Sequence, residues 1–476
     1  MSDCCSNENG RQYDIAVVGA GSAGFSAAIT AAEAGVRVAL IGHGTIGGTC
    51  VNVGCVPSKA LIRAMESAHS SHAAQRFAGI TVTSGVTDWS AVQAQKASLV
   101  NGLRDKKYEA LLPEYENIDY IYADGPARLV HGGVHIDGRI IRAGKTIITT
   151  GSSSSIPPIP GIEGVETLNS TTALELEILP ETMMVIGGGV IGCELGQMFS
   201  RAGVKVTICC RTRLLPEAGP EISEALKASF EAEGIKVCSG VGYQRIEQTP
   251  KGVQLHCETS GGTQIVTAEK VLIAAGRRPN TEHLGLAEVG VEVDGRGGIV
   301  VDGHMRTSNT SIYAAGDVTG RDQFVYMAAY GAKLAAKHAA GQPVDPYDNR
   351  TMPWVVFSDP QIAGVGMTAS EAIDAGYEVK ESIAPLNQVP RALAAADTRG
   401  LIKLVADEKT DKLLGAQIMA PEGADSIQTM VMALKFGMTT KELGAMIFPY
   451  LTTVEGLKLA AQGFEKDVTK LSCCAG

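Results

Sequence analysis

Two glycine-rich turns, each placed between a short apolar strand and a helix, constrain the fold of this chain more than any other feature. The first, Gly19-Ala-Gly21-Ser-Ala-Gly24, follows the apolar segment 13–18 and precedes an alanine-rich segment. The second, Gly187-Gly-Gly189-Val-Ile-Gly192, follows segment 183–186 in the same way. Such strand–turn–helix units bind dinucleotides, because backbone N–H groups at the helix start approach the pyrophosphate. The sequence therefore predicts an α/β fold with two Rossmann-like dinucleotide-binding domains.

The end of the second strand in each unit indicates which nucleotide binds. An acidic residue there bonds a ribose 2′-hydroxyl, whereas basic residues accommodate a 2′-phosphate. In the second unit the strand ends in Cys209-Cys210-Arg211-Thr-Arg213, which has two arginines and no acid. This favours NADPH over NADH, although the arginines could instead be ordinary solvated surface. The equivalent place in the first unit is Gly42, again without an acid.

The composition excludes several classes of protein. The 476 residues carry a formal net charge of −10, and no basic patch stands out, so we expect no nucleic-acid partner. Segment 15–32 has no charged residue, but its three glycines indicate a strand–turn–helix, and we expect no membrane insertion. The polar start does not resemble a secretory signal, and the 11 cysteines do not form a secreted disulfide framework. A cytoplasmic location is therefore expected.

A Cys-x4-Cys motif follows the first unit directly, in the segment GGTCVNVGCVPSK at 47–59. Pro57 fits the first turn of a helix. A cysteine at a helix start has its thiolate stabilised by the helix dipole. The spacing of Cys50 and Cys55 suits either a reversible disulfide or two ligands for one soft metal ion.

Together these motifs resemble those of the pyridine nucleotide–disulfide oxidoreductases. The matching segments are GAGSAG at 19–24, GGTCVNVGCVPSK at 47–59, TTGS at 149–152, GGGVIGCE at 187–194, AAGRRPN at 274–280 and YAAGDV at 313–318. The resemblance implies FAD on the first unit, NAD(P)H on the second, and a C-terminal α+β dimerisation domain. It makes Cys50 the thiol that exchanges with substrate and Cys55 the thiol against the flavin. Gly42 departs from the family, which usually has an acid there for the FAD ribose.

The resemblance also assigns further site residues. Asp317 would contact the flavin ribitol, and Lys59 would lie by the flavin with Glu194 as its ion-pair partner. The cofactor-binding residues implied are Gly19, Gly21, Gly24, Gly48, Thr49, Lys59, Gly151, Asp317, Gly187, Gly189, Gly192, Arg211, Arg213 and Arg277.

The predicted domain boundaries follow from these motifs and from a Ser/Pro-rich crossover near residues 152–160. We expect an N-terminal tail over 1–12, an FAD-binding domain over 13–160 and 286–350, an NADPH-binding domain over 161–285, and an interface domain over 351–476. Amphipathic helices are expected over 424–436 and 440–447.

The C-terminal region lacks a residue that thiol-reducing members of the family use. Those members carry a His-Pro-Thr-x-x-Glu segment, whose histidine exchanges protons with the thiol. The aligned stretch here is 448–455, with Tyr450 in place of the histidine and Glu455 kept. The sequence has no histidine after His338, so a disulfide substrate would lack its general acid.

The chain ends in LSCCAG, and the adjacent thiols of Cys473 and Cys474 suit capture of a soft metal ion. With FPYLTTVEGLKLAAQ at 448–462, this ending resembles the mercuric ion reductase branch of the family. The resemblance implies reduction of Hg(II), delivered as a thiol complex, with metal ligands Cys50, Cys55, Cys473 and Cys474. The catalytic set would add Tyr450, Glu455, Lys59 and Glu194, in a homodimer whose active sites are shared between subunits.

The N-terminal metal-binding domain of many such enzymes is not expected here, since only Cys4 and Cys5 precede the core. Two other functions remain as alternatives. A flavin-dependent reductase of a small disulfide is the nearest alternative function. A metal-sequestering protein on a flavoenzyme scaffold is the other.

Overall fold

The computed structural model describes residues 12–259 and 261–467, which divide into two compact units. The first unit contains the chain up to residue 60 together with 91–155 and 276–348. The second contains 61–90, 156–275 and the chain from 349 onward.

The first unit is built on a sheet of order β3-β2-β1-β6-β5-β4, with β17 pairing with β6. Strand β1 runs parallel to β2 and β6, whereas β5 and β6 are antiparallel. The strands are β1 (Tyr13–Val18), β2 (Val38–Gly42), β3 (Ile118–Tyr122), β4 (Arg128–Val130), β5 (Gly133–Ile136), β6 (Arg139–Ile148) and β17 (Ile312–Ala314).

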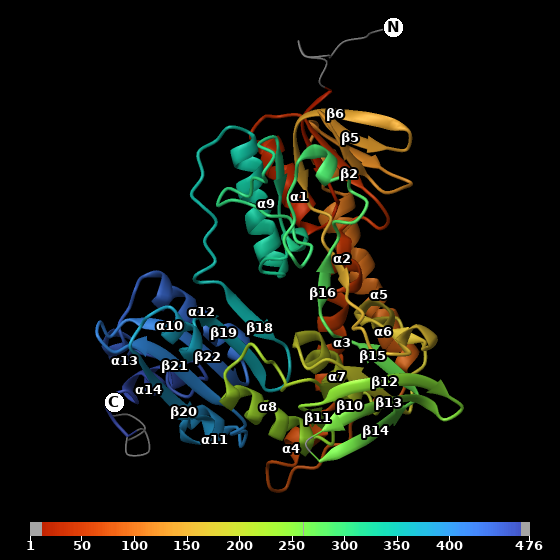
Figure 1. Cartoon of the computed structure of the whole chain (residues 1–476). Helices are drawn as coiled ribbons and strands as arrows, with labels where there is room; N and C mark the ends of the chain where they lie inside the picture. Colours follow the sequence, from red (N-terminus) through yellow and green to blue (C-terminus); the bar gives the residue numbers. More distant parts are fainter. Residues whose placement is uncertain (1–11, 260, 468–476) are drawn as a thin grey trace. The chain divides into compact units, whose positions relative to one another are not determined.

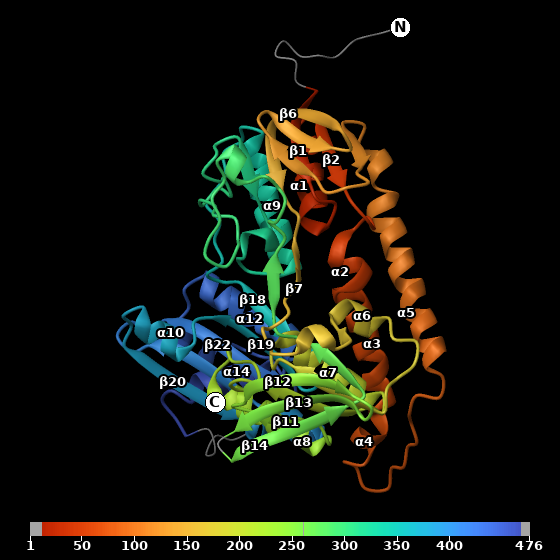
Figure 2. The same ribbon diagram turned by 45° about the vertical axis from the view of Figure 1, so that its right-hand side comes forward.

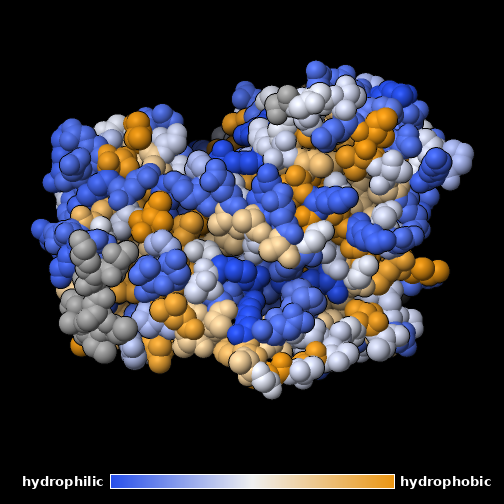
Figure 3. Space-filling view, turned by 90° about the horizontal axis from the view of Figure 1, so that it is seen from below, coloured by the Kyte–Doolittle hydropathy of each residue, from blue (hydrophilic) through white to orange (hydrophobic). Residues whose placement is uncertain are grey.

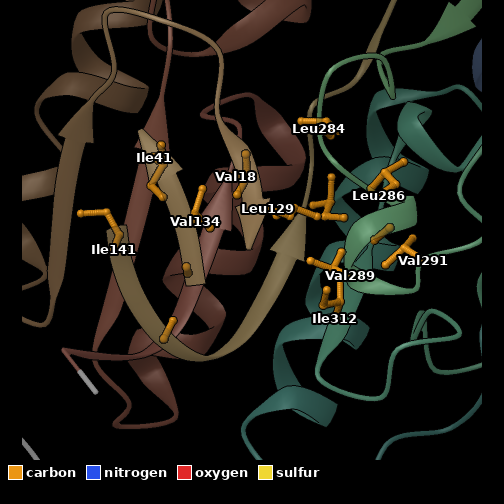
Figure 4. Packing of buried hydrophobic residues seen from close by; sticks show 14 of the residues in the cluster. Val18, Ile41, Leu129, Val134, Ile141, Leu284, Leu286, Val289, Val291 and Ile312 are labelled. Carbon is orange, nitrogen blue, oxygen red and sulfur yellow. The ribbon is translucent and has the colours of Figure 1, made fainter. Parts of the chain in front are cut away.

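Both faces of this sheet are covered by apolar packing. Helices α1 (Ser22–Glu33) and α9 (Val325–Ala339) lie side by side on one face, where their alanines allow close approach (Figure 1). On the other face, Val18, Ile41 and Val134 belong to a core cluster that extends to Leu286 and Ile312 (Figure 4). The parallel strands read as continuous apolar runs because both of their faces are buried.

Further elements include the two helices that carry the cysteine motif, α2 (Gly48–Val53) and α3 (Cys55–Ala68). Others are α5 (Trp89–Arg104), a π-helical turn at Asp105–Glu109, and the short antiparallel pair β7 (Ser152–Ser154) and β16 (Arg277–Pro279).

The second unit contains the second glycine-rich turn, in a parallel sheet of order β11-β10-β9-β15-β8. An antiparallel meander, β12-β13-β14, lies beside this sheet (Figure 2). Its apolar side chains pack into the same core. The elements are β8 (Thr167–Leu168), β9 (Thr182–Ile186), α7 (Val190–Arg201), β10 (Lys205–Cys210), α8 (Pro220–Ala232), β11 (Lys236–Ser239), β12 (Gly242–Thr249), β13 (Gly252–Thr259), β14 (Gly262–Ala268) and β15 (Lys270–Ile273).

The C-terminal part of the second unit is an antiparallel sheet of order β18-β19-β22-β21-β20, covered by helices. The helices predicted near 424–436 and 440–447 are confirmed as α12 and α13. The elements are β18 (Pro353–Val356), β19 (Gln361–Gly366), α10 (Ala369–Asp374), β20 (Val379–Pro385), α11 (Pro390–Ala394), β21 (Leu401–Asp407), β22 (Leu413–Ala420), α12 (Gly423–Lys435), α13 (Thr440–Ala445) and α14 (Glu455–Gln462).

The predicted fold class is confirmed, with two glycine-rich nucleotide-binding units and a C-terminal α+β part. Among residues 12–259 and 261–467, no helix is both long and apolar enough to cross a bilayer. The face shown in Figure 3 mixes polar and apolar side chains.

Candidate active site

The first glycine-rich turn leaves room for a pyrophosphate at the start of α1. Gly19 has φ +116°, which favours glycine, and Gly21 pairs with Gly47 in a parallel bridge. The N-terminus of α1 has no side-chain cap and no acidic residue in its first turn. Its free N–H groups can therefore bind an anion, and the residues present fit the pyrophosphate of FAD.

The second turn has the same geometry at the start of α7. Gly187 has φ +123°, and a Cβ added at Gly189 would meet no atom within 4 Å. The N-terminus of α7 also lacks a side-chain cap and an acidic first turn. The open space and the uncapped N–H groups fit the pyrophosphate of a nicotinamide nucleotide.

The two cysteines of the motif lie together, on consecutive helices. Cys50 is in α2 and Cys55 is the first residue of α3, as the sequence predicted for a helix start. Gly54 joins them, and a Cβ there would come within 2.9 Å of the Thr49 carbonyl oxygen. Both cysteines are half-buried thiols, and neither is in a disulfide. The pKa of Cys50 is raised, mainly by hydrogen bonding with Cys55 and also by burial. The positive charge of Lys59 lowers it.

Two tyrosines near the cysteine pair were not found from the sequence. Tyr108, on the π-helical turn, packs edge-on against Phe25, with ring centroids 4.8 Å apart. Burial raises the pKa of Tyr108, and negative charge on Cys50 and Cys55 raises it further. Burial also raises the pKa of Tyr326, and the negative charges of Asp322 and Cys55 raise it further. No sequence motif marks these tyrosines, because they reach the pair from distant segments.

Asp317 is held by a chain of hydrogen bonds. The Ser152 hydroxyl donates to Oδ2 of Asp317 at 2.6 Å, and Arg277 Nε donates to the Ser152 hydroxyl at 2.7 Å. The Arg277 Nε and Asp317 Oδ2 atoms are 3.9 Å apart. The structure thus brings together Arg277 and Asp317, which the sequence singled out separately, through Ser152, the last residue of the TTGS segment, for which the sequence indicated no role of its own. Gly151, beside Ser152, has φ +72° and accepts a backbone hydrogen bond from Asn280.

A tyrosine hydroxyl occupies the space beside Gly42, where the family resemblance led us to expect an acid. A Cβ added at Gly42 would lie 2.5 Å from the Tyr120 hydroxyl and 2.9 Å from Cβ of Ala20. Tyr120 is on β3, directly beside β2. A polar group therefore lies at the end of the strand where an acid was expected.

The two arginines after β10 differ in their contacts. Arg213 donates to the Ser223 hydroxyl at 3.1 Å and to the carbonyl oxygens of Pro216 and Ala218 at 2.9 and 2.8 Å. Arg211 is exposed, and within the described part of the chain its guanidinium has no hydrogen-bond or ion-pair partner. Arg211 is thus available for a ligand, whereas Arg213 holds the loop.

The ion pair of Lys59 with Glu194 stays a prediction. Lys59 lies on α3, one turn after Cys55. Glu194 is buried on α7 and accepts a hydrogen bond from the backbone N–H of Phe357 at 2.9 Å.

Glu455 is hydrogen-bonded to the backbone of the residue that follows Tyr450. The buried Glu455 carboxylate accepts a hydrogen bond from the Leu451 N–H at 3.1 Å, and Leu451 has φ +60°. Tyr450, next to it, is 50% exposed. Glu455 thus fixes the loop that presents Tyr450.

Cys473 and Cys474, like Cys4 and Cys5, lie outside the described residues. Within 12–259 and 261–467, no three His, Cys, Asp or Glu side chains gather as a metal site. The described part of the predicted metal site is therefore the Cys50–Cys55 pair.

Comparison with known proteins agrees with this geometry. The pyridine nucleotide-disulphide oxidoreductase family matches residues 13–336, and its dimerisation domain matches residues 352–461. A solved structure of the HOCl-induced flavoprotein disulfide reductase RclA from Escherichia coli, a Cu(II) complex, superposes with a TM-score of 0.83 at 31% identity, covering 95% of this chain and 99% of that one. LpdA from Mycobacterium tuberculosis superposes with a TM-score of 0.81 at 26% identity, covering 94% and 99%.

Curated relatives narrow the comparison. The mercuric reductase of Staphylococcus aureus is 44% identical over 468 residues, covering 98% of this chain and 84% of the relative. That of Bacillus cereus is 45% identical over 478 residues, covering 100% and 75%. That of Streptomyces lividans is 42% identical over 471 residues and covers 98% of each chain. The chain therefore belongs to the pyridine nucleotide–disulphide oxidoreductase family, in its mercuric reductase branch.

Proposed function

We propose that this enzyme reduces thiol-bound Hg(II) to Hg(0) with NADPH. The observation that carries the proposal is the contact between the Cys50 and Cys55 thiols at the start of α3. Two adjacent soft ligands suit a two-coordinate thiophilic ion. Bound FAD and NADPH supply the two electrons that the reduction requires.

The metal reaches this pair by thiol exchange. Cys473 and Cys474 of the partner subunit take Hg(II) from a small-thiol complex, each displacing one thiol ligand. Cys50 attacks next and Cys55 displaces the last tail thiol, so that Hg(II) becomes a dithiolate of this pair. Lys59 favours the thiolate form, since its charge lowers the pKa of Cys50 against the effects of Cys55 and burial. Two-electron reduction releases Hg(0), which binds thiolates weakly, and leaves the pair ready for another ion.

Tyr450 and Glu455 act in this scheme without a histidine. The product of the reduction step is a neutral atom, so this step delivers no proton to a departing thiol. Glu455 positions the loop through the Leu451 N–H, and Tyr450 meets the incoming metal complex.

Dimerisation through the C-terminal domain completes the site. The family's dimerisation domain covers residues 352–461. It exposes large apolar side chains, of which Ile447 is 98% and Phe436 78% exposed. Burying such side chains between two subunits would be favourable. We place the enzyme in the cytoplasm, where small thiols hold Hg(II).

One assay separates this function from its alternatives. NADPH oxidation is followed with Hg(II) in excess small thiol, and separately with glutathione disulfide or lipoamide as acceptor. We expect turnover with Hg(II) only. Turnover with a disulfide would favour a small-thiol reductase, and no turnover at all would favour a metal-sequestering protein.

A further inference from the structure

Cys209 and Cys238 stand opposite each other on adjacent parallel strands. Cys209 on β10 is in register with Cys238 on β11. Residues paired in this way project their side chains to the same face of the sheet. Both cysteines pack, with Cys257 of β13, into the apolar core between the parallel sheet and the meander.

The two thiols are in contact, and one of them can be reached from solvent. Cys209 and Cys238 are neighbours across the two strands, each shifts the pKa of the other, and neither is in a disulfide. Cys209 is fully buried, whereas Cys238 is half-buried. Cys257 directs its sulfur elsewhere, 3.7 Å from the carbonyl oxygen of Gln264. Solvent can therefore reach the pair through Cys238, whereas Cys209 is shielded by the core.

The surroundings favour a nucleophilic Cys238. The hydrogen bond from Cys209 lowers the pKa of Cys238 to about 6; burial opposes this, and the positive charges of Lys236 and Lys227 reinforce it. The same contact, with burial, raises the pKa of Cys209. These effects favour the thiolate form of Cys238 over that of Cys209.

We propose that Cys209 and Cys238 form a second binding site for a soft, two-coordinate metal ion such as Hg(II), separate from the Cys50–Cys55 pair. The Cys238 thiolate attacks a mercury bis-thiolate and displaces one ligand as thiolate. The Cys209 thiol then displaces the second ligand and gives it its proton. One Hg(II) is bound, two small-thiol ligands are released, and no electron is transferred.

The number of ligands makes the site selective. In the described part of the chain no third His, Cys, Asp or Glu joins a metal cluster here. Structural zinc sites use four ligands, so a site with only two cysteines does not suit zinc. A soft ion that takes only two thiolate ligands needs no further ligand here.

The site adjoins the second glycine-rich turn. The Cys209 carbonyl oxygen accepts hydrogen bonds from the Gly187 N–H and the Tyr243 hydroxyl, each at 2.9 Å. A Cβ at Gly188 would lie 2.9 Å from Cβ of Cys210. Binding of a metal at Cys209 should therefore disturb the nucleotide turn and weaken NADPH binding several-fold.

The test compares the holoenzyme with two variants. Each protein is exposed to excess HgCl2, washed with excess glutathione, and assayed for retained mercury. We expect Cys238→Ala to retain one Hg(II) fewer than wild type, and the matched core variant Cys257→Ala to retain as much as wild type. Equal retention by wild type and Cys238→Ala would overturn the site.

A second measurement needs no variant. Trypsin should release residues 206–211 and 237–245 as separate peptides, and in mercury-loaded wild type we expect them joined by one Hg(II). Their recovery without mercury would contradict the proposal. With less than one equivalent of Hg(II), Cys238→Ala should reduce the ion as wild type does, so failure of this site and failure of the proposed function are distinguishable. An NADPH dissociation constant that mercury leaves unchanged in wild type would refute the coupling to the nucleotide turn.

Discussion

The Ser152 hydroxyl donates a 2.6 Å hydrogen bond to Oδ2 of Asp317 and accepts one from Arg277 Nε at 2.7 Å. The arginine thus acts on the aspartate through a serine. One oxygen of Asp317 is held in place, so that the carboxylate is oriented before the cofactor binds.

Removing this serine hydroxyl should weaken FAD binding. Ser152→Ala removes the donor to Asp317 and one of the two acceptors of Arg277, which keeps its bond to the Ser152 carbonyl oxygen, at a cost of about 1–3 kcal/mol. We expect roughly a tenfold rise in the FAD dissociation constant, measured by flavin fluorescence on apoprotein. Ser154→Ala is the control, since Ser154 is on the same strand and its hydroxyl has no side-chain hydrogen bond in the described structure. Equal FAD affinity in the two variants would show that the chain of bonds is not needed.

Restoring an acid beside the FAD ribose should fail unless Tyr120 is also changed. A side chain at position 42 would collide with the Tyr120 hydroxyl and with Ala20. We expect Gly42→Glu to lower the melting temperature and the FAD content, and Tyr120→Ala in the same chain to recover part of both. Tyr120→Phe alone should raise the FAD dissociation constant if the hydroxyl serves the ribose. A stable, FAD-replete Gly42→Glu enzyme would contradict this view of the site.

The arginines after β10 should separate specificity from stability. Arg211→Ala removes an unengaged guanidinium, so we expect the NADPH-to-NADH ratio of kcat/KM to fall by about tenfold, as for loss of a charge-assisted bond. Arg213→Ala breaks three hydrogen bonds within the loop and should lower the melting temperature. Steady-state kinetics with both nucleotides and thermal denaturation of both variants check this. The opposite pattern would assign the phosphate to Arg213.

These residues show what the sequence could predict. Both glycine-rich turns and the helix start at Cys55 are local patterns, because the turn, the strand and the helix are contiguous. Ser152, Tyr120 and Cys238 could not be predicted, since each acquires its role from a partner on another segment. Register decides such contacts: Cys238 is opposite Cys209 only because β11 pairs with β10 in that alignment. The sequence shows that Gly42 stands where an acid was expected, but only the pairing of β3 with β2 shows that Tyr120 fills the space beside it.

Acid should destabilise the enzyme through His69. Burial lowers the pKa of His69 to about 4, and the nearby charge of Arg201 adds to this effect. An unfolded chain takes up the proton near pH 6.5, whereas the folded one does so only near 4. Stability from this group is thus complete above pH 6.5 and is lost as the pH falls toward 4. We expect His69→Gln to flatten the dependence of melting temperature on pH between 7 and 4.5. His131→Gln, an exposed control, should keep the wild-type slope.

The C-terminal cysteines provide the most direct test of the proposed function. Mercury held by two bulky thiols must exchange them one at a time before it reaches the half-buried Cys50 and Cys55. A Cys473→Ala, Cys474→Ala variant should therefore lose most of its kcat/KM with the glutathione complex of Hg(II). It should lose far less with small ligands such as bromide, which can enter without prior exchange. Flavin reduction by NADPH, followed by stopped flow, should match wild type because it does not involve the tail. Wild-type kcat/KM with the glutathione complex would show that the tail delivers no metal, and the route to Cys50 would then have to begin elsewhere.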